Sequence, residues 1–573
     1  MTKRPARCAA AVLGAFMLVA CAGPSAGPAG GRADPASQAA SAPLSNRTLV
    51  IALRVEPTTI SPKPFRQAGI EIGIVLRLFN AGLAINDEQD VSHPYLVQSL
   101  PQLNTDSWRL LPEGGMETAY HLRPNLTWHD GTPLTADDFV FAWQVFATPE
   151  LGNAGSPPLN QIDEVMARDP QTVLVRWKRP YPYAGSLQAS DLPPLPRHIL
   201  EPSFPVQGEQ YDAFASLPFW TTDYVGPGPY RLERWEPGAF MEAAAFDGHT
   251  LGRPKIERIR LLFIGDPNTV LANLLSGAID FAGTGAVYFQ QATVIRQEWV
   301  PTNAGRVLIA PGGWRYTHVQ LRPELAKPRT LLDARIRRAL AFAIDRQALN
   351  DGLFEGQGIM ADSMVAPTVD YFADVNRAIT KYAYDLKKTD ELMESAGYAK
   401  GPDGVYESAV DGRFSTELTV IAQAQNEAEM SLMGAAWRQA GFELQQSVMP
   451  TAQAQSGQAR AAFPGLFTSG GGSGEALLAN LASIGIPKPE NRWTGSNRGA
   501  WSNPDYDRLF EAFNTTLDRA ERTRQIVEMM KIMTSELPVF PLYFQPSITA
   551  HVAALTGPQN SGSGWDVQTW ELH

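Results

Sequence analysis

Cysteine is almost absent from this sequence. The only two cysteines among the 573 residues are Cys8 and Cys21. The rest of the chain can form no disulfide, so its stability must come from a large buried core rather than from covalent cross-links. The only membrane-like apolar segment is at the start, and the sequence contains neither a Gly-rich phosphate loop nor a regular repeat.

Positive charge is also scarce. The chain has 48 Lys and Arg against 59 Asp and Glu, which gives a net charge of −11 and a pI near 5.4. Because nucleic-acid binding ordinarily needs a basic surface, this balance argues against a nucleic-acid partner. The composition, 44% hydrophobic and 19% charged, is that of a globular protein. A length of 573 residues predicts at least two domains.

Motifs for catalysis and metal binding are missing as well. The eight histidines show no metal-ligand spacing, because the closest pair, His121 and His129, falls on a predicted strand and a predicted turn. There is no His-Glu-x-x-His, and residues 471–475 lack the final glycine of a nucleophile elbow. Helix capping explains the adjacent Asp137 and Asp138 better than acid–base chemistry does. We therefore predict no catalytic residue, no metal site and no cofactor.

One basic pair needs its own interpretation. Arg337 and Arg338 stand next to each other on a predicted helix, where they would suit an anion site. An exposed helix face, or an ion pair with Asp333 or Asp345, is the interpretation that we prefer.

The N-terminus has the pattern of a secretory signal peptide. A basic start is followed by an apolar segment, residues 9–20, that is too short to span a bilayer. The Leu-Val-Ala-Cys that ends at Cys21 resembles a bacterial lipobox, whose cysteine is lipidated and becomes the first residue of the mature chain. We expect a signal peptide over residues 1–20, and a lipidated Cys21 with a flexible tether over residues 21–45.

The sequence predicts a strand around residue 120 and a tight turn after it. Thr118, Tyr120 and Leu122 alternate with their neighbours in the two-residue period of a strand. Asp130-Gly131 is a turn pair, because glycine tolerates the positive φ that a tight reversal needs.

A capped helix follows the turn. Thr135 is a suitable N-cap, and Asp138 stands at the third helical position, as in a capping box. Phe139, Trp143 and Phe146 then fall on one apolar face of the helix. Together these signals predict a strand, a turn and a helix, but they do not by themselves indicate a function.

This stretch resembles the signature of the family 5 extracellular solute-binding proteins, the peptide-binding components of ABC importers. The family pattern runs Tyr, Leu-Arg, Trp or Phe, Asp-Gly, Pro, Thr-Ala-Asp-Asp, Val. The matching positions are Arg123, Trp128, Asp130, Gly131, Pro133, Thr135, Ala136, Asp137, Asp138 and Val140. Further stretches that resemble family landmarks are residues 78–83, 225–230, 337–346 and 501–507.

The resemblance implies a two-lobed α/β fold of the periplasmic-binding-protein type II class, in its large form with an extra subdomain and a hinge between the lobes. Two strands should cross between the lobes. The expected division is lobe I at 46–90, its extra subdomain at 91–200, lobe I again at 201–309, lobe II at 310–535, and a return to lobe I at 536–573.

The resemblance also suggests ligand contacts near the start of each lobe. Glu56 and Thr58 lie where the family places ligand contacts on its first strand, although they would equally suit a turn cap. Trp314, Arg315 and Tyr316 begin the second lobe, and aromatic and arginine side chains suit a cleft that grips varied ligands. Core packing of Trp314 and Tyr316 is the alternative.

A third group of candidate contacts contains Arg460, Phe463 and Phe467. Oligopeptide-binding relatives carry an aspartate here that pairs with the peptide's α-amino group, and Leu466 stands at that position. A buried ammonium without a carboxylate would be costly, and Glu475 would replace the aspartate only if the glycine run before it folds back.

We therefore predict a lipid-anchored, monomeric solute-binding protein on the extracytoplasmic side of the membrane, periplasmic or at the cell surface. It would capture peptides or related solutes and deliver them to an ABC permease and its ATPase subunits. A ligand-sensing or adhesion lipoprotein with the same fold is the second hypothesis, and a secreted hydrolase is the third.

Overall fold

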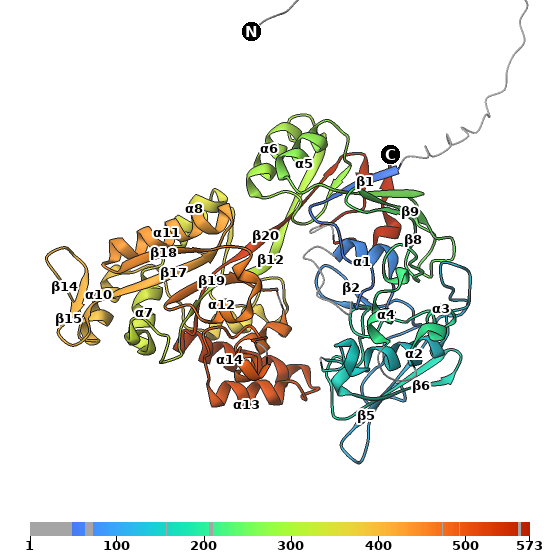
Figure 1. The fold of residues 1–573 in the computed structure, drawn as a ribbon, viewed down its shortest axis with the longest axis horizontal. Helices are drawn as coiled ribbons and strands as arrows, with labels where there is room; N and C mark the ends of the chain where they lie inside the picture. The colour runs from blue at the N-terminus through green and yellow to red at the C-terminus, as the bar shows by residue number, and fades with distance from the viewer. Residues whose placement is uncertain are drawn as a thin grey trace, which may run out of the picture. The chain divides into compact units, whose positions relative to one another are not determined.

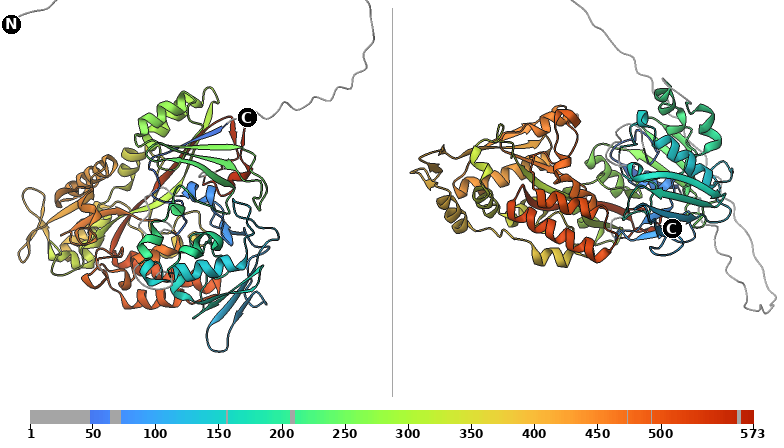
Figure 2. Two further views of the ribbon diagram at one scale, coloured as in Figure 1. Left: turned by 45° about the vertical axis from the view of Figure 1, so that its right-hand side comes forward. Right: turned by 90° about the horizontal axis from the view of Figure 1, so that it is seen from below.

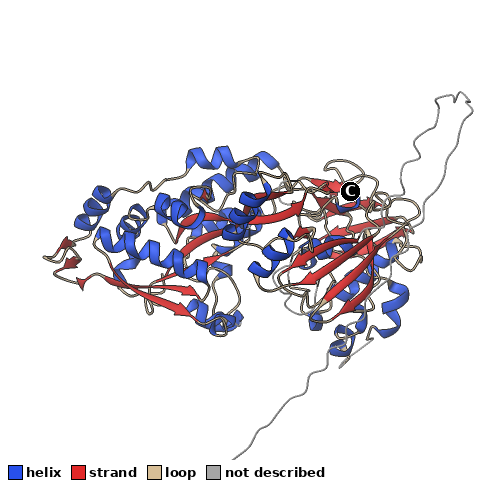
Figure 3. Ribbon diagram, turned by 90° about the horizontal axis from the view of Figure 1, so that it is seen from above, coloured by secondary structure: helices blue, strands red, loops and turns tan. Residues whose placement is uncertain are grey.

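The computed structural model describes residues 48–63, 73–155, 157–205, 210–472, 474–491, 493–559 and 563–573. The predicted signal peptide, the lipidated Cys21 and the tether lie outside these residues and stay predictions. The unit from Asn46 to His573 mixes helices with strands throughout its length (Figures 1 and 3). None of the helices in the described ranges is both long and apolar enough to cross a membrane.

A mixed sheet, with eleven strands over the described residues, is the main element of this unit. Its order is β18-β17-β19-β12-β20-β11-β1-β10-β9-β8, and β13 pairs with β20 at one side. The strands are β1 (Thr48–Leu53), β8 (Tyr230–Glu236), β9 (Phe240–Ala245), β10 (Arg258–Phe263), β11 (Phe281–Ala282), β12 (Gly305–Val319), β13 (Ile359–Met360), β17 (Ser415–Ile421), β18 (Glu443–Met449), β19 (Leu466–Gly470) and β20 (Val539–Val552).

The two longest strands, β12 and β20, lie side by side in the middle of this sheet (Figure 1). They join its two halves, which are β18-β17-β19 on one side and β11-β1-β10-β9-β8 on the other. They pair antiparallel from Gly305 opposite Val552 to His318 opposite Val539. The C-terminal end of β20 also pairs with β11, and the C-terminal end of β12 pairs with β19. The predicted lobe boundary at residue 310 falls inside β12, close to a register shift that follows Pro311. The domain division itself stays a prediction.

The predicted strand–turn–helix stretch is confirmed. Met116–His121 forms β5 and Ala136–Phe146 forms α2. Between them Gly131 adopts a φ of 87° and donates to the carbonyl of Trp128 at 2.9 Å. The carboxylate of Asp138 accepts from the backbone N–H of Thr135 at 2.9 Å, as the capping box requires. It also accepts from the N–H of Arg197, so the same side chain holds a second segment against the helix.

This stretch belongs to a separate four-stranded sheet of order β4-β5-β7-β6. Helix α2 packs against β6 and β7 and covers one face of the sheet (Figure 2). Phe139 and Phe146 are buried as predicted, and Trp143 is half-buried. The remaining strands of this sheet are β4 (Trp108–Leu110), β6 (Ile162–Asp169) and β7 (Thr172–Trp177).

Helices surround the large sheet. Asp385 caps α10, which ends before Gly397 at a φ of 86°. The methionine-rich helix α14 stops before Pro538. The helices are α1 (Gly73–Phe79), α3 (Arg197–Leu200), α4 (Tyr211–Ala215), α5 (Pro267–Leu275), α6 (Phe289–Trp299), α7 (Ala334–Phe342), α8 (Arg346–Phe354), α9 (Phe372–Ala378), α10 (Leu386–Ser395), α11 (Ala424–Ala440), α12 (Gly457–Ala461), α13 (Pro504–Phe513) and α14 (Arg519–Glu536).

The preferred interpretation of the basic pair on α7 is wrong for Arg337. This side chain is buried and donates to the carbonyls of Leu331 and Glu536 at 2.9 and 2.7 Å. Arg338 donates to the carbonyl of Ser535 at 2.9 Å. Both arginines therefore bind the C-terminal carbonyls of α14, which have no partners within that helix and favour a nearby cation.

The remaining strands are short. They form two two-stranded sheets, β2-β3 and β21-β22, and one three-stranded sheet, β14-β15-β16. They are β2 (Ala84–Asn86), β3 (Ser92–Pro94), β14 (Ala399–Lys400), β15 (Tyr406–Ser408), β16 (Gly412–Arg413), β21 (Leu555–Thr556) and β22 (Glu571–Leu572).

Candidate ligand-binding site

Glu56 and Thr58, the first predicted contacts, lie in the loop after β1. The carboxylate of Glu56 accepts from Trp235 Nε1 at 2.6 Å and from the backbone N–H of Gly238 at 2.9 Å. It is therefore held by the β8–β9 hairpin. Thr58 is exposed. Of the two, only Thr58 has a side chain that is free of hydrogen bonds within the described residues.

The second predicted group alternates between the two faces of β12. Trp314 and Tyr316 lie on one face and stack with their ring centroids 4.0 Å apart, exposed by 1% and 2% respectively. Both belong to the apolar core that they share with α14. Arg315 lies on the opposite face, where its guanidinium is buried against the carboxylate of Glu429 on α11. Burial disfavours the Arg315 charge, but the Glu429 carboxylate raises its pKa above the usual value.

The third predicted group lies beside the same face of β12 as Tyr316. Phe463 and Phe467 stack with ring centroids 5.5 Å apart, and each lies 6.4 Å from the ring of His318. Arg460, on α12, is half-buried. Its Nε is buried and has no hydrogen-bond partner in the described structure. The structure thus brings Arg460, Phe463 and Phe467 close to one strand face.

Leu466 is fully buried in the core between the sheet and α11. It pairs with Val319 on β12, so it lies on the sheet face opposite to Phe467. An ammonium group at this position would enter an apolar core, which makes it unsuitable as a charge-binding site.

The carboxylate of Glu475 follows the glycine run and is already occupied. It binds Arg519 Nη1 at 2.6 Å, and it pairs with Arg522, whose side chain is only 4% exposed. Burial opposes the Glu475 charge, but Arg522, Tyr183 and Arg519 together lower its pKa below the usual value. Two arginine partners leave this carboxylate without spare negative charge for a ligand ammonium.

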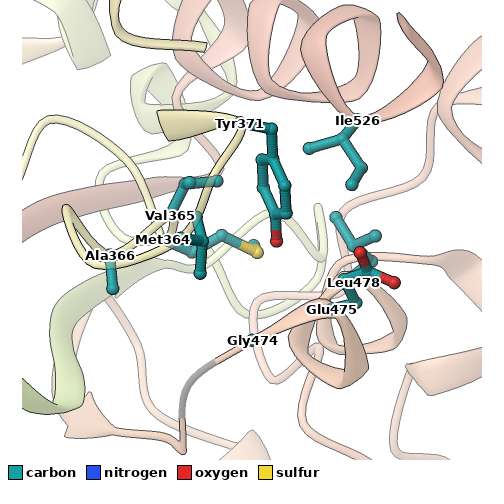
Figure 4. A pocket seen from close by; sticks show the side chains of 9 residues that line it. Met364, Val365, Ala366, Tyr371, Gly474, Glu475, Leu478 and Ile526 are labelled. Carbon is teal, nitrogen blue, oxygen red and sulfur yellow. The ribbon is translucent and has the colours of Figure 1, made fainter. Parts of the chain in front are cut away.

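A small pocket lies against Glu475. Its volume of about 10 Å³ suffices for roughly one water molecule. Figure 4 shows Tyr371 and Ile526 on one side of this space and Glu475 and Leu478 on another. The pocket is lined by Met364, Val365, Ala366, Val369, Tyr371, Gly474, Glu475, Leu478 and Ile526.

Tyr183 connects two segments that are far apart in the sequence. Its hydroxyl donates to Glu475 and accepts from Arg522 Nη2 at 2.7 Å, and its ring lies 4.8 Å from the Arg522 guanidinium carbon. The residue follows β7 of the four-stranded sheet, whereas Arg522 is on α14. This contact is a direct polar connection between the signature-bearing sheet and the C-terminal helices.

We expect Tyr183→Phe to lower the free energy of unfolding by about 1.5–3 kcal/mol, because the ring remains while two hydrogen bonds to charged groups are lost. Urea denaturation measures this change. The matched control is Tyr211→Phe, since the Tyr211 hydroxyl makes no hydrogen bond in the described structure and its loss should be nearly neutral. Equal effects of the two substitutions would contradict a role for the Tyr183 hydroxyl.

Two arginines near the third group were missed or interpreted differently from the sequence. Arg498 lies in a loop outside every motif, yet its Nη1 donates to Ser469 Oγ at 2.6 Å beside Phe467. Arg322 was not singled out from the sequence either, and it donates to the carbonyls of Arg498 and Pro487 at 2.6 and 2.9 Å.

Metal binding finds no support in the side chains of the described ranges. No group of three or more His, Cys, Asp or Glu residues there is arranged to hold a metal ion.

Comparison with known families decides the classification. Residues 100–483, more than half of the chain, match the model of the bacterial extracellular solute-binding proteins, family 5. The chain belongs to this family. The match includes the four-stranded sheet, strand β12 and the predicted contacts from Trp314 to Phe467.

Relatives and solved structures agree with this assignment. The oligopeptide-binding protein AppA of Bacillus subtilis is 24% identical over 56% of this chain and 56% of its own length. The glutathione-binding protein GsiB of Salmonella paratyphi A is 28% identical over 58% of this chain and 61% of its own. The alignments therefore span little more than half of these relatives. NikZ from Campylobacter jejuni, solved with Ni(L-His), shares the fold with a TM-score of 0.73, 21% identity and coverage of 91% of this chain and 99% of that one.

Proposed function

We propose that this protein is the substrate-binding component of an ABC importer and that it captures peptides or related solutes between two lobes. Family membership supports the substrate-binding role. The observation that carries the proposal is the pair of long strands β12 and β20, which are common to both halves of the large sheet. Two shared strands form a natural hinge, because a small change in their twist would move one half against the other.

Peptides are the ligand class that we favour. AppA carries the name of an oligopeptide-binding protein and GsiB that of a glutathione-binding protein, and glutathione is itself a small peptide. The family also holds ligands of other kinds, since NikZ was solved with Ni(L-His). The candidate contacts are Glu56, Thr58, Trp314, Arg315, Tyr316, Arg460, Phe463 and Phe467.

The remaining parts of the proposal concern partners and location. The protein would act as a monomer, anchored by a lipid on Cys21 to the extracytoplasmic side of a membrane, and it would deliver its ligand to a permease coupled to ATPase subunits. It would perform no covalent chemistry, since it needs only to bind and release. Ligand can shift the lobes only by binding one arrangement more tightly than the other.

A thermal-shift screen of the purified mature chain tests this function. We expect at least one peptide or amino-acid-derived solute to raise the melting temperature, because a ligand at 100 times its Kd stabilises the native state by about 2.7 kcal/mol. The function would be contradicted if broad peptide and solute mixtures left the melting temperature unchanged. Hydrolysis of a peptide during the same incubation would favour the hydrolase hypothesis instead.

A further inference from the structure

A groove lies between the end of α6 and the start of β12, two elements that follow one another in the chain (Figure 1). Its volume of about 280 Å³ is close to the lower end of the range for small-ligand sites. None of the predicted ligand contacts lines this space, which we call the α6–β12 groove. Its side chains include Arg296, Trp299, Val300, Arg306, Val307 and Leu308.

One wall of the α6–β12 groove is a strand with a free edge. Strand β19 pairs with β12 only from Arg315 onward, so residues 305–311 pair with β20 alone within the described part of the chain. A strand edge without a neighbour leaves a row of unpaired N–H and C=O groups, which can pair with another extended segment. The start of β12 has such a row on the side away from β20.

The direction of each backbone group follows from one hydrogen bond. The N–H of Val552 on β20 donates to the carbonyl of Asp280, next to β11, at 2.9 Å. Successive residues of a strand direct these groups to opposite sides, so the preceding residue of β20 binds β12 through its partner Arg306. Val307 then directs its N–H and C=O away from β20, and no described residue bonds to either group. The same alternation puts Pro311, which has no N–H, at an outward position.

The walls of the groove expose apolar surface. Val300 directly follows α6 and is 76% exposed, whereas Trp299 beside it is 5% exposed. Val307 and Leu308 are half-buried. Gly305 lets β12 pass close to the indole, since a Cβ at this position would lie 2.4 Å from the Trp299 ring. The groove thus joins a fixed aromatic wall to an exposed valine, which suits the apolar side chains of a bound segment.

The two arginines of the groove carry uncompensated positive charge. Neither Arg296 nor Arg306 forms an ion pair with a carboxylate of the described ranges, and Arg296 Nη1 binds only the neutral side-chain oxygen of Gln357, at 2.7 Å. By contrast, Arg258 on β10 of the same sheet pairs with Glu233 at 2.6 Å. An acidic segment would supply the missing charges, because opposite charges on neighbouring strands stabilise their pairing.

We propose that the α6–β12 groove binds an extended, acidic segment of a protein partner by strand addition. Its backbone would pair with the outward groups of Val307. Its side chains would alternate, with acidic ones on the Arg306 face of the sheet and apolar ones on the Val307 face. The inference rests on the proposed function, in which the permease is the protein that a substrate-binding component must contact. A second copy of this chain fits less well, since it would bring the arginines of both copies together.

The groove leaves the predicted ligand contacts free. Across the sheet, Val307 pairs with Ala550, Ala550 with Ala282, and Ala282 with Ala52 on β1. Three strand spacings, roughly 14 Å, therefore separate the free edge from β1. The candidate contact Glu56 lies further along the chain, beyond the end of β1. A partner segment in the groove and a solute at the predicted contacts can thus bind at the same time.

Calorimetric titration with two capped peptides tests this surface. The first probe is an acetylated and amidated hexapeptide in which Val and Asp alternate, and the second has Asn in place of Asp. Each is titrated into the mature chain with and without a saturating solute from the thermal-shift screen. We expect the acidic probe to bind in both conditions and the neutral probe to bind about 2- to 30-fold more weakly, which is the range for two cross-strand charge pairs.

Variants locate the edge. Val307→Pro removes an outward N–H without breaking the ladder to β20, and Pro311 already occupies an equivalent position, so the variant should fold but no longer bind the acidic probe. Arg306→Gln and, at an exposed position, Val300→Asp should each weaken binding about 1.5- to 5-fold. The matched control is Val410→Asp, at a residue that is 90% exposed outside the groove, and it should bind like the unmodified protein.

Uptake measurements assign the partner. In cells that carry the whole importer, Val307→Pro should bind the solute with unchanged affinity and lose most of the uptake. Uptake equal to that of the unmodified protein would overturn the assignment of the groove to the permease.

The remaining outcomes separate this inference from the proposed function. Equal affinity of the acidic probe for the unmodified protein, Val307→Pro and Val300→Asp would overturn the inference. Displacement of the probe by the solute would do the same, because it would place the probe at the ligand site. A protein that binds a solute but not the acidic probe would lose the inference and keep the function. A negative solute screen would overturn the function, and probe binding alone would then leave the edge without the permease as its partner.

Discussion

Replacing Glu429 by glutamine is expected to lower the free energy of unfolding by about 3–5 kcal/mol, because it leaves the buried charge of Arg315 without its partner. Glu429 is 0% exposed and Arg315 is 7% exposed. The carboxylate lies on α11 and contacts both Nη2 and Nε of the guanidinium, the latter at 3.4 Å. The pair connects the helix to the crossing strand β12, so its loss should weaken the second half of the sheet.

Urea denaturation measures this effect, and two further variants control it. The exposed pair of Glu528 and Lys531 on α14 provides the matched comparison, and Glu528→Gln should cost less than about 1 kcal/mol. The double replacement Arg315→Met with Glu429→Leu should recover most of the loss, since no charge is then left unpaired. A cost for Glu429→Gln as small as that for Glu528→Gln would show that the pair is not buried in solution.

Acidification from about pH 6.5 to pH 4 is expected to destabilise the protein through two buried histidines, His129 and His249. Burial lowers the pKa of His129 to about 4 and that of His249 to about 4, from the ordinary 6.5. In the unfolded chain both protonate near 6.5, so below that pH the unfolded state binds more protons and stability falls until the folded pKa is reached. The loss is about 1.4 kcal/mol per pH unit for each histidine, or about 3 kcal/mol each by pH 4.

The contacts of His129 explain why it resists protonation. Its Nδ1 accepts from the backbone N–H of Gly226 at 3.1 Å, and its Nε2 lies 3.0 Å from the carbonyl of Gly228. The neutral ring with its proton on Nε2 satisfies both contacts, and a proton added at Nδ1 would face the Gly226 donor. The ring thereby fixes the turn before β8 to the signature stretch.

Urea denaturation across this pH range checks the expectation, and proton resonances of the histidine rings give the folded pKa values directly. His129→Gln should reduce the steepness of the pH dependence by about 1.4 kcal/mol per pH unit, because the contribution of this histidine is then removed. The exposed His121 supplies the control variant, and His121→Gln should leave the steepness unchanged. Titration of the His129 ring near pH 6.5 in the native protein would contradict this account.

Local structure was predictable from the sequence wherever short-range chemistry determines it. Gly131 in the turn and Asp138 in the capping box both act as their sequence contexts predict. These devices involve residues only a few positions apart, so their partners are visible in the sequence. The two-lobed class was likewise available from the resemblance of the signature stretch, and family membership and the solved relatives confirm it.

Long-range partners were not predictable. Arg337 binds the end of a helix almost two hundred residues later, which no local pattern indicates. Trp314 and Arg315 are adjacent in sequence but lie on opposite faces of β12, one in an apolar core and the other in a buried ion pair. Arg498 lies in no motif and becomes noticeable only because the fold places it over Ser469 without a carboxylate.

The central claim is that a solute is captured between two halves connected by β12 and β20. Small-angle X-ray scattering of the mature chain tests it most directly, with and without a solute that raises the melting temperature. The account predicts a smaller radius of gyration at saturating solute, since a ligand that binds both halves favours the arrangement that encloses it. An unchanged radius of gyration with a solute that measurably binds would contradict capture by closure.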